Sequence, residues 1–279
     1  MKKKSIYIAI GVSAAAIVFL LTSVGINPQV TENRTFFANS SLSCNCVAFR
    51  LDDVVDAKPG YLQFVVIDFF MEQDIPLTIG IIGNQFGADQ YTIDFLKNHL
   101  DNSSKNLEIA NHGWNHTNFK NLSFEEQDAS IGKTNNLIFE KLGVMPKVFI
   151  PPFNEFDKNT LNALEKNHIT HISSIISLDE PSVTKSRFYH LPATSTSGEY
   201  NQDQEWAPLV GKKTFELVKD SISKYGFAVV MMHPRDFGQF AKQGNAVSYE
   251  QLAEMEFVIN ETKKAGFEIV PIGKINRES

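Results

Sequence analysis

The feature that most constrains this fold is a regular alternation of short apolar runs with amphipathic stretches, which extends from about residue 44 to residue 275. Short runs rich in Val, Ile and Phe indicate strands, whereas apolar residues at every third or fourth position indicate helices. The predicted strands are residues 46–51, 77–82, 107–110, 147–150, 170–176, 227–232 and 267–271. The predicted helices are residues 60–73, 88–100, 124–142, 157–167, 212–225 and 248–265, and residues 177–208 are expected to be irregular. This alternation predicts a parallel sheet with helices outside it, most simply a single α/β barrel.

Composition supports a globular protein with a sizeable core. Of the 279 residues, 43% are hydrophobic and 21% are charged, which excludes disorder, collagen and coiled coil as overall descriptions. The formal net charge of −6 does not suit a polyanion, so we expect no nucleic-acid partner. Cys44 and Cys46 cannot form a disulfide framework, and a bond between residues two apart is expected to be strained.

An uncharged apolar run occupies residues 6–26 and follows Lys2, Lys3 and Lys4. The run is long enough to cross a bilayer as a helix, with the lysines on the cytoplasmic side and the rest of the chain outside. We therefore expect a membrane anchor over residues 1–26, a polar stalk over 27–43 and an extracellular domain over 44–279. The alternative is a cleaved signal peptide and a secreted protein.

Polar and titratable residues follow three of the predicted strands. The first strand ends in Arg-Leu-Asp-Asp (50–53), the third precedes Asn-His-Gly-Trp-Asn-His (111–116), and strand 227–232 precedes His-Pro-Arg-Asp (233–236). Each segment alone has a structural explanation, because adjacent aspartates are often a solvated turn and a lone histidine is often a surface or core residue. In an α/β barrel, however, the carboxyl ends of the strands meet at one end of the barrel. The three segments together therefore indicate a site.

The residue types match a catalytic zinc site. His112 and His116 are four residues apart, so both imidazoles point to one side if the chain turns helically after the strand. A carboxylate from the first strand would complete a set of two histidines and one carboxylate, with an open position for water. No glutamate lies between the histidines, so the general base must come from elsewhere, and one of the adjacent aspartates is available.

Four segments then identify a resemblance to a known family. They are Asp52-Asp53, His112-Gly113-Trp114-Asn115-His116, Ile150-Pro151-Pro152-Phe153 and Met231-Met232-His233. With these segments, in this order, the chain resembles the polysaccharide deacetylases of the NodB-homology type, carbohydrate esterase family 4. The resemblance implies a distorted α/β barrel and metal-dependent removal of acetyl groups from an N-acetylated carbohydrate polymer.

The resemblance also implies a role for each matching residue. The residues that would hold a divalent metal, with zinc as the expected ion, are Asp53, His112 and His116. Asp52 would be the general base that activates water, and His233 would protonate the leaving amine. The backbone N–H of Phe153 would help to hold the oxyanion.

The sequence departs from the family's pattern at several positions. Ile150 stands where the family has an arginine that pairs with the catalytic base. Arg50 lies two residues before Asp52 on a predicted strand, so both side chains leave the same face and Arg50 is a candidate to replace that arginine. The D-x-x-D-W motif is missing. The candidates for its supporting role are Asp179, Asp236 and Trp206.

Trp114 has two interpretations, because its ring could stack on a sugar or pack within the fold. Our prediction for the whole chain is a membrane-anchored, extracellular, metal-dependent deacetylase of N-acetylated sugars. Two alternatives stay open: a hydrolase of a non-sugar amide, and a catalytically inactive carbohydrate-binding barrel. Intact Asp52 and His233 favour an enzyme, whereas the missing arginine favours the inactive barrel.

Overall fold

The computed structural model describes residues 44–56, 61–102, 106–174, 188–202, 205–239 and 246–275. The predicted anchor and stalk, residues 1–43, lie outside the described residues, as does Asp179. Within the ranges given above, no helix combines the length and the apolar character needed to cross a membrane.

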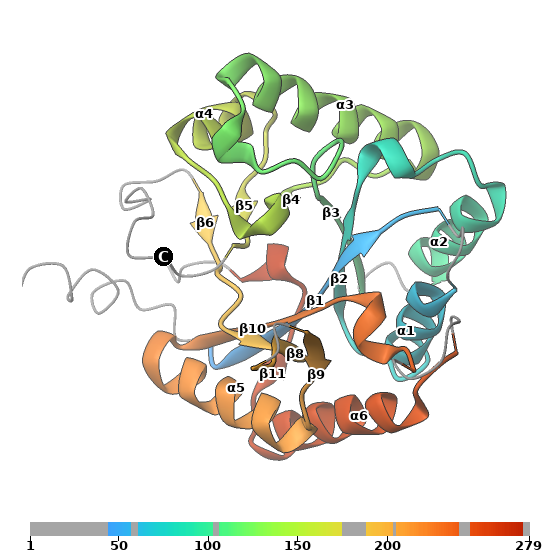
Figure 1. Ribbon diagram of the computed structural model, residues 1–279, viewed down its shortest axis with the longest axis vertical. Coiled ribbons are helices and arrows are strands. Elements are labelled where there is room, and N and C mark those ends of the chain that lie inside the picture. Colours follow the sequence, from blue (N-terminus) through green and yellow to red (C-terminus); the bar gives the residue numbers. More distant parts are fainter. Residues whose placement is uncertain are drawn as a thin grey trace, which may run out of the picture. The chain divides into compact units, whose positions relative to one another are not determined.

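A curled parallel sheet forms the centre of the fold (Figure 1). Its strands in the described residues are β1 (Cys46–Val54), β2 (Leu77–Ile81), β3 (Leu107–Asn111), β4 (Val148–Phe149), β5 (His171–Ile172), β6 (Tyr189–His190), β7 (Ser195–Thr196), β10 (Phe227–Met232) and β11 (Glu268–Ile269). The order is β6-β5-β4-β3-β2-β1-β10-β7, and β11 pairs with β1. The strand order ends at β6 and β7, which share no ladder in the described part of the chain, so the predicted barrel is an open half-barrel.

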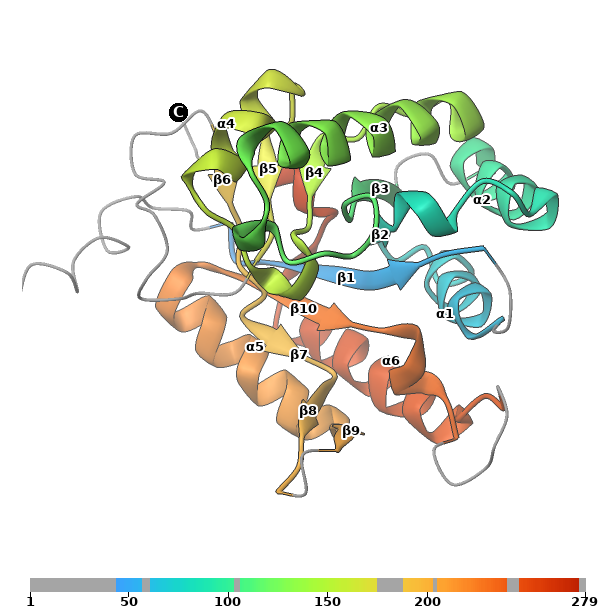
Figure 2. The ribbon, with the colours of Figure 1, turned by 45° about the horizontal axis from the view of Figure 1, so that its top comes forward.

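Helices cover the outside of this sheet, as the sequence pattern predicts (Figure 2). They are α1 (Leu62–Met71), α2 (Gln90–Asn102), α3 (Phe124–Leu142), α4 (Lys158–Lys166), α5 (Gly211–Tyr225) and α6 (Tyr249–Lys264). Helix α3 has the predicted bounds because its ends are marked locally. Ser123 and Glu126 form a capping box at the first turn, and Gly143 adopts a left-handed conformation after the last.

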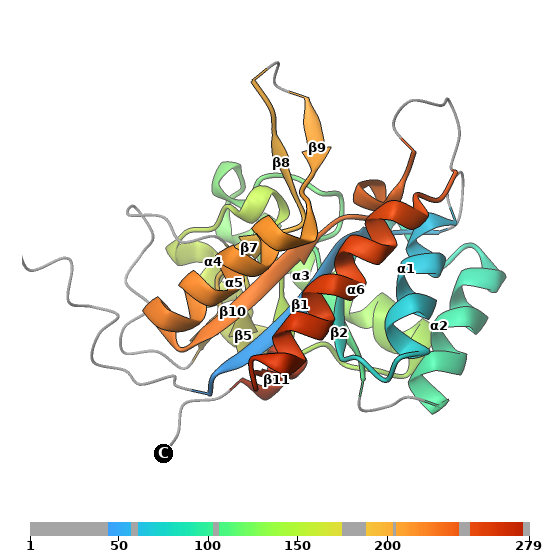
Figure 3. The ribbon, with the colours of Figure 1, turned by 90° about the horizontal axis from the view of Figure 1, so that it is seen from below.

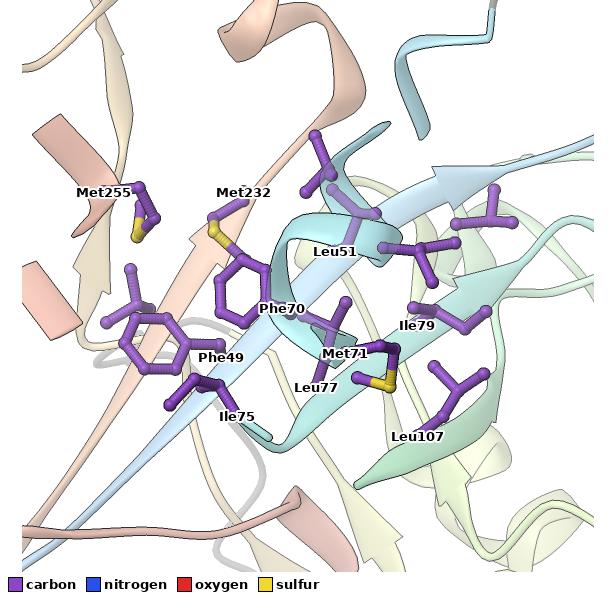
Figure 4. Close-up of a cluster of buried hydrophobic side chains, with 14 of the residues drawn as sticks. Phe49, Leu51, Phe70, Met71, Ile75, Leu77, Ile79, Leu107, Met232 and Met255 are labelled. Carbon is purple, nitrogen blue, oxygen red and sulfur yellow. The ribbon is translucent and has the colours of Figure 1, made fainter. Parts of the chain in front are cut away.

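Strand β1 shows how the core places the polar residues. Val47, Phe49 and Leu51 belong to the large apolar cluster between the sheet and the helices (Figure 4). Cys46 and Ala48 alternate with them and belong to a smaller apolar cluster on the inner face of the sheet. Full burial of a larger apolar side chain, such as Val, Leu or Phe, contributes about 1.5–3 kcal/mol to the free energy of folding. Along β1, apolar residues fill the start of the inner face and polar side chains follow towards its carboxyl end.

The expectation that residues 177–208 are irregular needs correction. Part of the segment 177–208 is described, and it contains β6, β7 and a two-stranded antiparallel hairpin of β8 (Gly198–Tyr200) and β9 (Trp206–Pro208). Strands this short are held by pairing with neighbours rather than by their own sequence pattern. Cys44 and Cys46 form a disulfide, with their Cα atoms 5.1 Å apart.

Candidate metal centre and active site

A β-bulge in β1 separates the two adjacent aspartates. Leu51 pairs with Ile79 and Val54 pairs with Ile81, so β1 holds one more residue than β2 between these pairs. Asp53 adopts a positive φ of 61° within the bulge. A bulge of this kind re-aims a side chain. The predicted strand ended at residue 51, whereas the observed strand continues through both aspartates and sends them to different partners.

Asp53 lies between the two predicted histidine ligands. Its Oδ1 is 3.2 Å from Nε2 of His112 and 3.2 Å from Nε2 of His116. One donor atom from each of the three residues lies within 4.8 Å of the other two. The His112 side chain is buried, whereas those of Asp53 and His116 are 36% and 27% exposed. The cluster therefore has three nitrogen and oxygen donors and one side open to solvent.

The hydrogen bonding of His112 suits a metal ligand. Its Nδ1 lies 2.7 Å from the backbone oxygen of Ile150. A carbonyl oxygen can only accept, so Nδ1 carries the proton and, in the neutral ring, the lone pair is on Nε2. Metal-bound histidines commonly donate their other ring N–H in this way. The donor set therefore fits zinc or a related divalent ion.

The charges within the cluster reinforce each other. Burial alone would raise the pKa of Asp53, but hydrogen bonds from His112 and His116 outweigh burial and hold that pKa well below its ordinary value. Burial alone would lower the pKa of His112, but the hydrogen bond to Asp53 and the charges of Asp52 and Asp53 raise it. The cluster thus stabilises a carboxylate beside positive charge, which a divalent cation would also supply.

The two histidines do not meet through a helical turn, contrary to our expectation. The residues between them form no helix, and both Gly113 (φ 74°) and His116 (φ 50°) are left-handed. A side chain at Gly113 would also be crowded, since a Cβ there would lie 3.1 Å from the ring of Phe119. The Asn111 side chain accepts the N–H of Gly113 and donates to α3. The loop is therefore held by α3 and by its backbone turns.

Arg50 pairs with Asp52, as its position on the strand predicts. The buried guanidinium donates from Nε to Oδ1 at 2.8 Å and from Nη2 to Oδ2 at 2.6 Å. Its remaining donors bond the backbone and side-chain oxygens of Ser173, at 3.0 and 2.9 Å, and the side chain of Asn154, at 2.7 Å. Sequence reasoning missed Ser173 and Asn154, although Ser173 directly follows β5 and obeys the same strand-end rule.

Phe153 lies beside the cluster on the loop that Arg50 reaches through Asn154. Its ring is 59% exposed and packs on the ring of His116, with the centroids 4.7 Å apart. Phe153 and Asn154 both have positive φ values, 59° and 56°. Non-glycine residues in this conformation are uncommon and cluster at functional sites. The loop is thus tightly bent next to the candidate ligands.

His233 directly follows β10 and lies beside Asp236. Oδ2 of Asp236 accepts the His233 backbone N–H at 2.8 Å and lies 3.8 Å from Nδ1 of the ring. Its Oδ1 accepts the indole N–H of Trp206 at 2.5 Å, and the Trp206 ring meets the His233 ring edge to face at 5.3 Å. The charge of His233 also lowers the pKa of Asp53, with a smaller effect than His112 and His116 have. Asp236 and Trp206 thus both contact His233, and their role in place of the missing motif stays a prediction.

Trp114 is partly buried against neighbouring side chains. The Lys133 ammonium lies 3.7 Å from the centre of its ring, and a Cβ added to Gly83 would lie only 2.6 Å from a ring carbon. These contacts agree with the packing interpretation. Sugar stacking by Trp114 stays a prediction.

Comparison with protein families covers the segments from Asp52 to Phe153 but not His233. A profile of the polysaccharide deacetylase family matches residues 40–172. Chitin deacetylase 1 of Cryptococcus neoformans is 27% identical over 104 residues, which cover 37% of this chain and 20% of that protein. The chain therefore matches only about a fifth of the length of this curated relative.

Solved structures share the fold. A family 4 acetyl xylan esterase from Clostridium thermocellum, in complex with a cobalt ion, has a TM-score of 0.56 at 18% identity, over 82% of this chain and 89% of that one. BA3943 of Bacillus anthracis, described as a pseudoenzyme of this family, has a TM-score of 0.56 at 17% identity, over 83% and 65%.

Proposed function

Because the chain belongs to the polysaccharide deacetylase family, we propose that it is a metal-dependent hydrolase that removes N-acetyl groups from an extracellular or cell-surface polysaccharide. The observation that carries this proposal is the grouping of Asp53, His112 and His116 in one cluster. Two further pairs support it. The Asp52 carboxylate is held by Arg50, and His233 lies beside the carboxylate of Asp236. Metal-assisted amide hydrolysis requires these groups: metal ligands, a base and an acid.

Each residue has a defined task in this reaction. Asp53, His112 and His116 would hold a divalent metal, which would supply Lewis acidity for the acetyl carbonyl and for the attacking water. Asp52 accepts a proton from the attacking water, and the N–H of Phe153 donates to the developing oxyanion. His233 donates a proton to the sugar nitrogen as the C–N bond breaks. The products are acetate and a free amine.

Arg50 orients the Asp52 carboxylate for this task. Its two hydrogen bonds occupy one lone pair on each carboxylate oxygen, so each oxygen retains a further acceptor site for water. The carboxylate can therefore accept a proton while it remains bound to the guanidinium. In the family, an arginine at the position of Ile150 pairs with the catalytic base. Here Arg50 would make that pair from β1.

Two measurements test the proposal. The purified chain should bind one equivalent of zinc or another divalent ion by elemental analysis, and it should release acetate from N-acetylglucosamine oligomers. A chelator should abolish acetate release, and added metal should restore it. Metal binding without acetate release from any N-acetylated oligomer would contradict the deacetylase assignment.

A second candidate is an inactive carbohydrate-binding barrel. It is favoured by the burial of Asp52, which is 3% exposed and has both oxygens bound to Arg50. The fold shared with BA3943 is compatible with it. This candidate predicts that the chain binds an N-acetylated oligomer without releasing acetate.

We also propose that the domain is extracellular and anchored in the membrane. Support comes from the uncharged run over residues 6–26 and the lysines before it. The full chain should fractionate with membranes, and protease added to intact cells should remove the domain. Recovery of soluble protein that begins near residue 27 would indicate secretion instead.

A further inference from the structure

We propose that the β8–β9 hairpin, together with Arg235, forms a subsite for a second sugar ring of the polymer, beside His233. The inference rests on the proposed function, because it extends the same site. Its central residues are Tyr200 and Trp206, which face each other across the hairpin. Neither residue holds the metal or transfers a proton, so the subsite would set chain-length preference rather than perform chemistry.

Trp206 is held by several neighbouring side chains, which makes it the base of the subsite. Its indole N–H donates to Asp236, its edge meets His233, and the Arg235 guanidinium lies over its face at 4.8 Å. Gly198 allows the indole to lie against the hairpin, since a Cβ there would lie 2.6 Å from the indole nitrogen. The indole therefore connects the acid His233 to the hairpin without freedom to move.

Tyr200 presents the exposed aromatic surface. Its ring meets the Trp206 ring edge to face at 5.2 Å and is inclined to it by 83°. The residue is 61% exposed although its ring is held by Trp206, so an aromatic plane faces solvent in a fixed orientation. Aromatic planes of this kind suit the C–H faces of pyranose rings, and a pre-oriented side chain loses little entropy on binding.

Arg235 adds directional hydrogen-bond donors next to this plane. It is exposed, stacks on Trp206, and forms no ion pair with a carboxylate of the described residues. The guanidinium lies over the indole, and its N–H groups can donate to a ligand. These donors suit the hydroxyl groups of a sugar whose ring lies against Tyr200.

The hairpin is anchored well enough to act as a wall. Figure 3 shows it projecting away from the sheet. Glu199 pairs with Lys213 of α5 at 2.5 Å, and the Leu209 N–H donates to Ser197 at 2.7 Å where the hairpin leaves the sheet. The ring centroids of His233 and Trp206 are 5.3 Å apart, and those of Trp206 and Tyr200 are 5.2 Å apart. Tyr200 therefore lies one or two sugar units beyond the proton donor.

The test compares a polymer-like substrate with a minimal one. Tyr200→Ala should lower kcat/KM for the N-acetylglucosamine tetramer about tenfold, the size of one aromatic contact. Arg235→Gln should lower it by a similar factor, because it removes a charged donor. Hydrolysis of a small aryl acetate should stay within about twofold of wild type in both variants. Tyr200→Phe keeps the ring and should retain activity on the tetramer.

Tyr249→Ala is the matched control, because Tyr249 is also an exposed tyrosine, 77% accessible, but begins α6. It should leave activity on both substrates unchanged. Unchanged tetramer kinetics in both Tyr200→Ala and Arg235→Gln would overturn the subsite. An equal loss on the tetramer and the aryl acetate would also overturn it, because the defect would then lie in the chemistry.

Binding separates failure of the subsite from failure of the proposed function. Isothermal titration with the tetramer requires no turnover. If wild type releases no acetate but binds the tetramer about tenfold more tightly than Tyr200→Ala does, the subsite stands and the deacetylase assignment fails. If wild type deacetylates the tetramer and Tyr200→Ala binds it equally well, the subsite fails and the assignment stands.

Discussion

The early region of the chain, up to residue 172, and the late region, from residue 188, contribute to the site in different ways. The early region supplies the candidate metal ligands from two short segments, one in β1 and one directly after β3. The late region supplies His233 after β10, but the neighbours of that ring come from separate segments: Asp236 from the next turn and Trp206 from the hairpin. Sequence spacing therefore reveals the early half of the site, whereas the late half depends on how the chain folds back.

The largest expected effect tests the early region. Asp53→Asn replaces an anionic donor with a neutral amide, so zinc affinity should fall at least about a hundredfold and acetate release should become undetectable. Elemental analysis after dialysis gives the metal content. Asp94→Asn, an exposed position on α2, is the control and should keep both properties. Full metal content in Asp53→Asn would move the ligand role to another residue.

The next test asks whether the late region acts without holding metal. His233→Ala should reduce turnover about 10²–10⁴-fold, the usual contribution of a general acid, with metal content unchanged. Asp52→Asn keeps the shape of the side chain, but the amide cannot accept the proton of the attacking water. This variant should therefore also retain metal while its deacetylation rate falls. Loss of metal from His233→Ala would show that His233 is a metal ligand. The late region would then hold metal as the early region does.

A smaller effect concerns stability. Arg50→Met leaves the buried Asp52 carboxylate without its partner, which should lower the free energy of unfolding by about 3–5 kcal/mol. Urea unfolding followed by tryptophan fluorescence measures this change. The double variant Arg50→Met/Asp52→Asn removes the stranded charge and should recover part of the loss. Equal stability of Arg50→Met and wild type would show that the pair contributes little to folding.

Arg50 also provides a rescue experiment for the catalytic role. The double variant Arg50→Met/Ile150→Arg returns an arginine to the position where the family carries it. If Arg50 substitutes for that arginine, the double variant should regain about tenfold activity over Arg50→Met alone. An added arginine that further reduces both folding and activity would show that the two positions are not interchangeable.

The smallest effect concerns His190 at the edge of the late region. Burial lowers the pKa of this histidine to about 4, against about 6.5 in the unfolded chain. The unfolded chain binds the proton more readily, so stability is fully present above about pH 6.5 and is lost as pH falls towards 4. Between pH 7 and 5.5, wild type should lose about 1 kcal/mol more than His190→Gln in urea unfolding. Parallel pH dependence in both proteins would exclude this contribution.

Local signals predicted much of the fold. The bounds of α3 and β10 agree with the sequence because a capping box, a terminal glycine and an unbroken apolar run mark them. Strand β1 was predicted too short because two adjacent aspartates resemble a strand end. The hairpin at residues 198–208 was missed because its strands have three residues each, too few to show a period.

The site shows the same division between local and distant information. The sequence alone determined which residue types gather at the strand ends, because parallel strands bring their carboxyl ends together whatever the loops between them do. Tertiary structure decided which aspartate meets the histidines, because the bulge depends on the register between β1 and β2. It also brought Arg50 to Ser173 and Trp206 to Asp236, contacts 123 and 30 residues apart. Such contacts form only when distant segments pack together, so no local pattern in the chain encodes them.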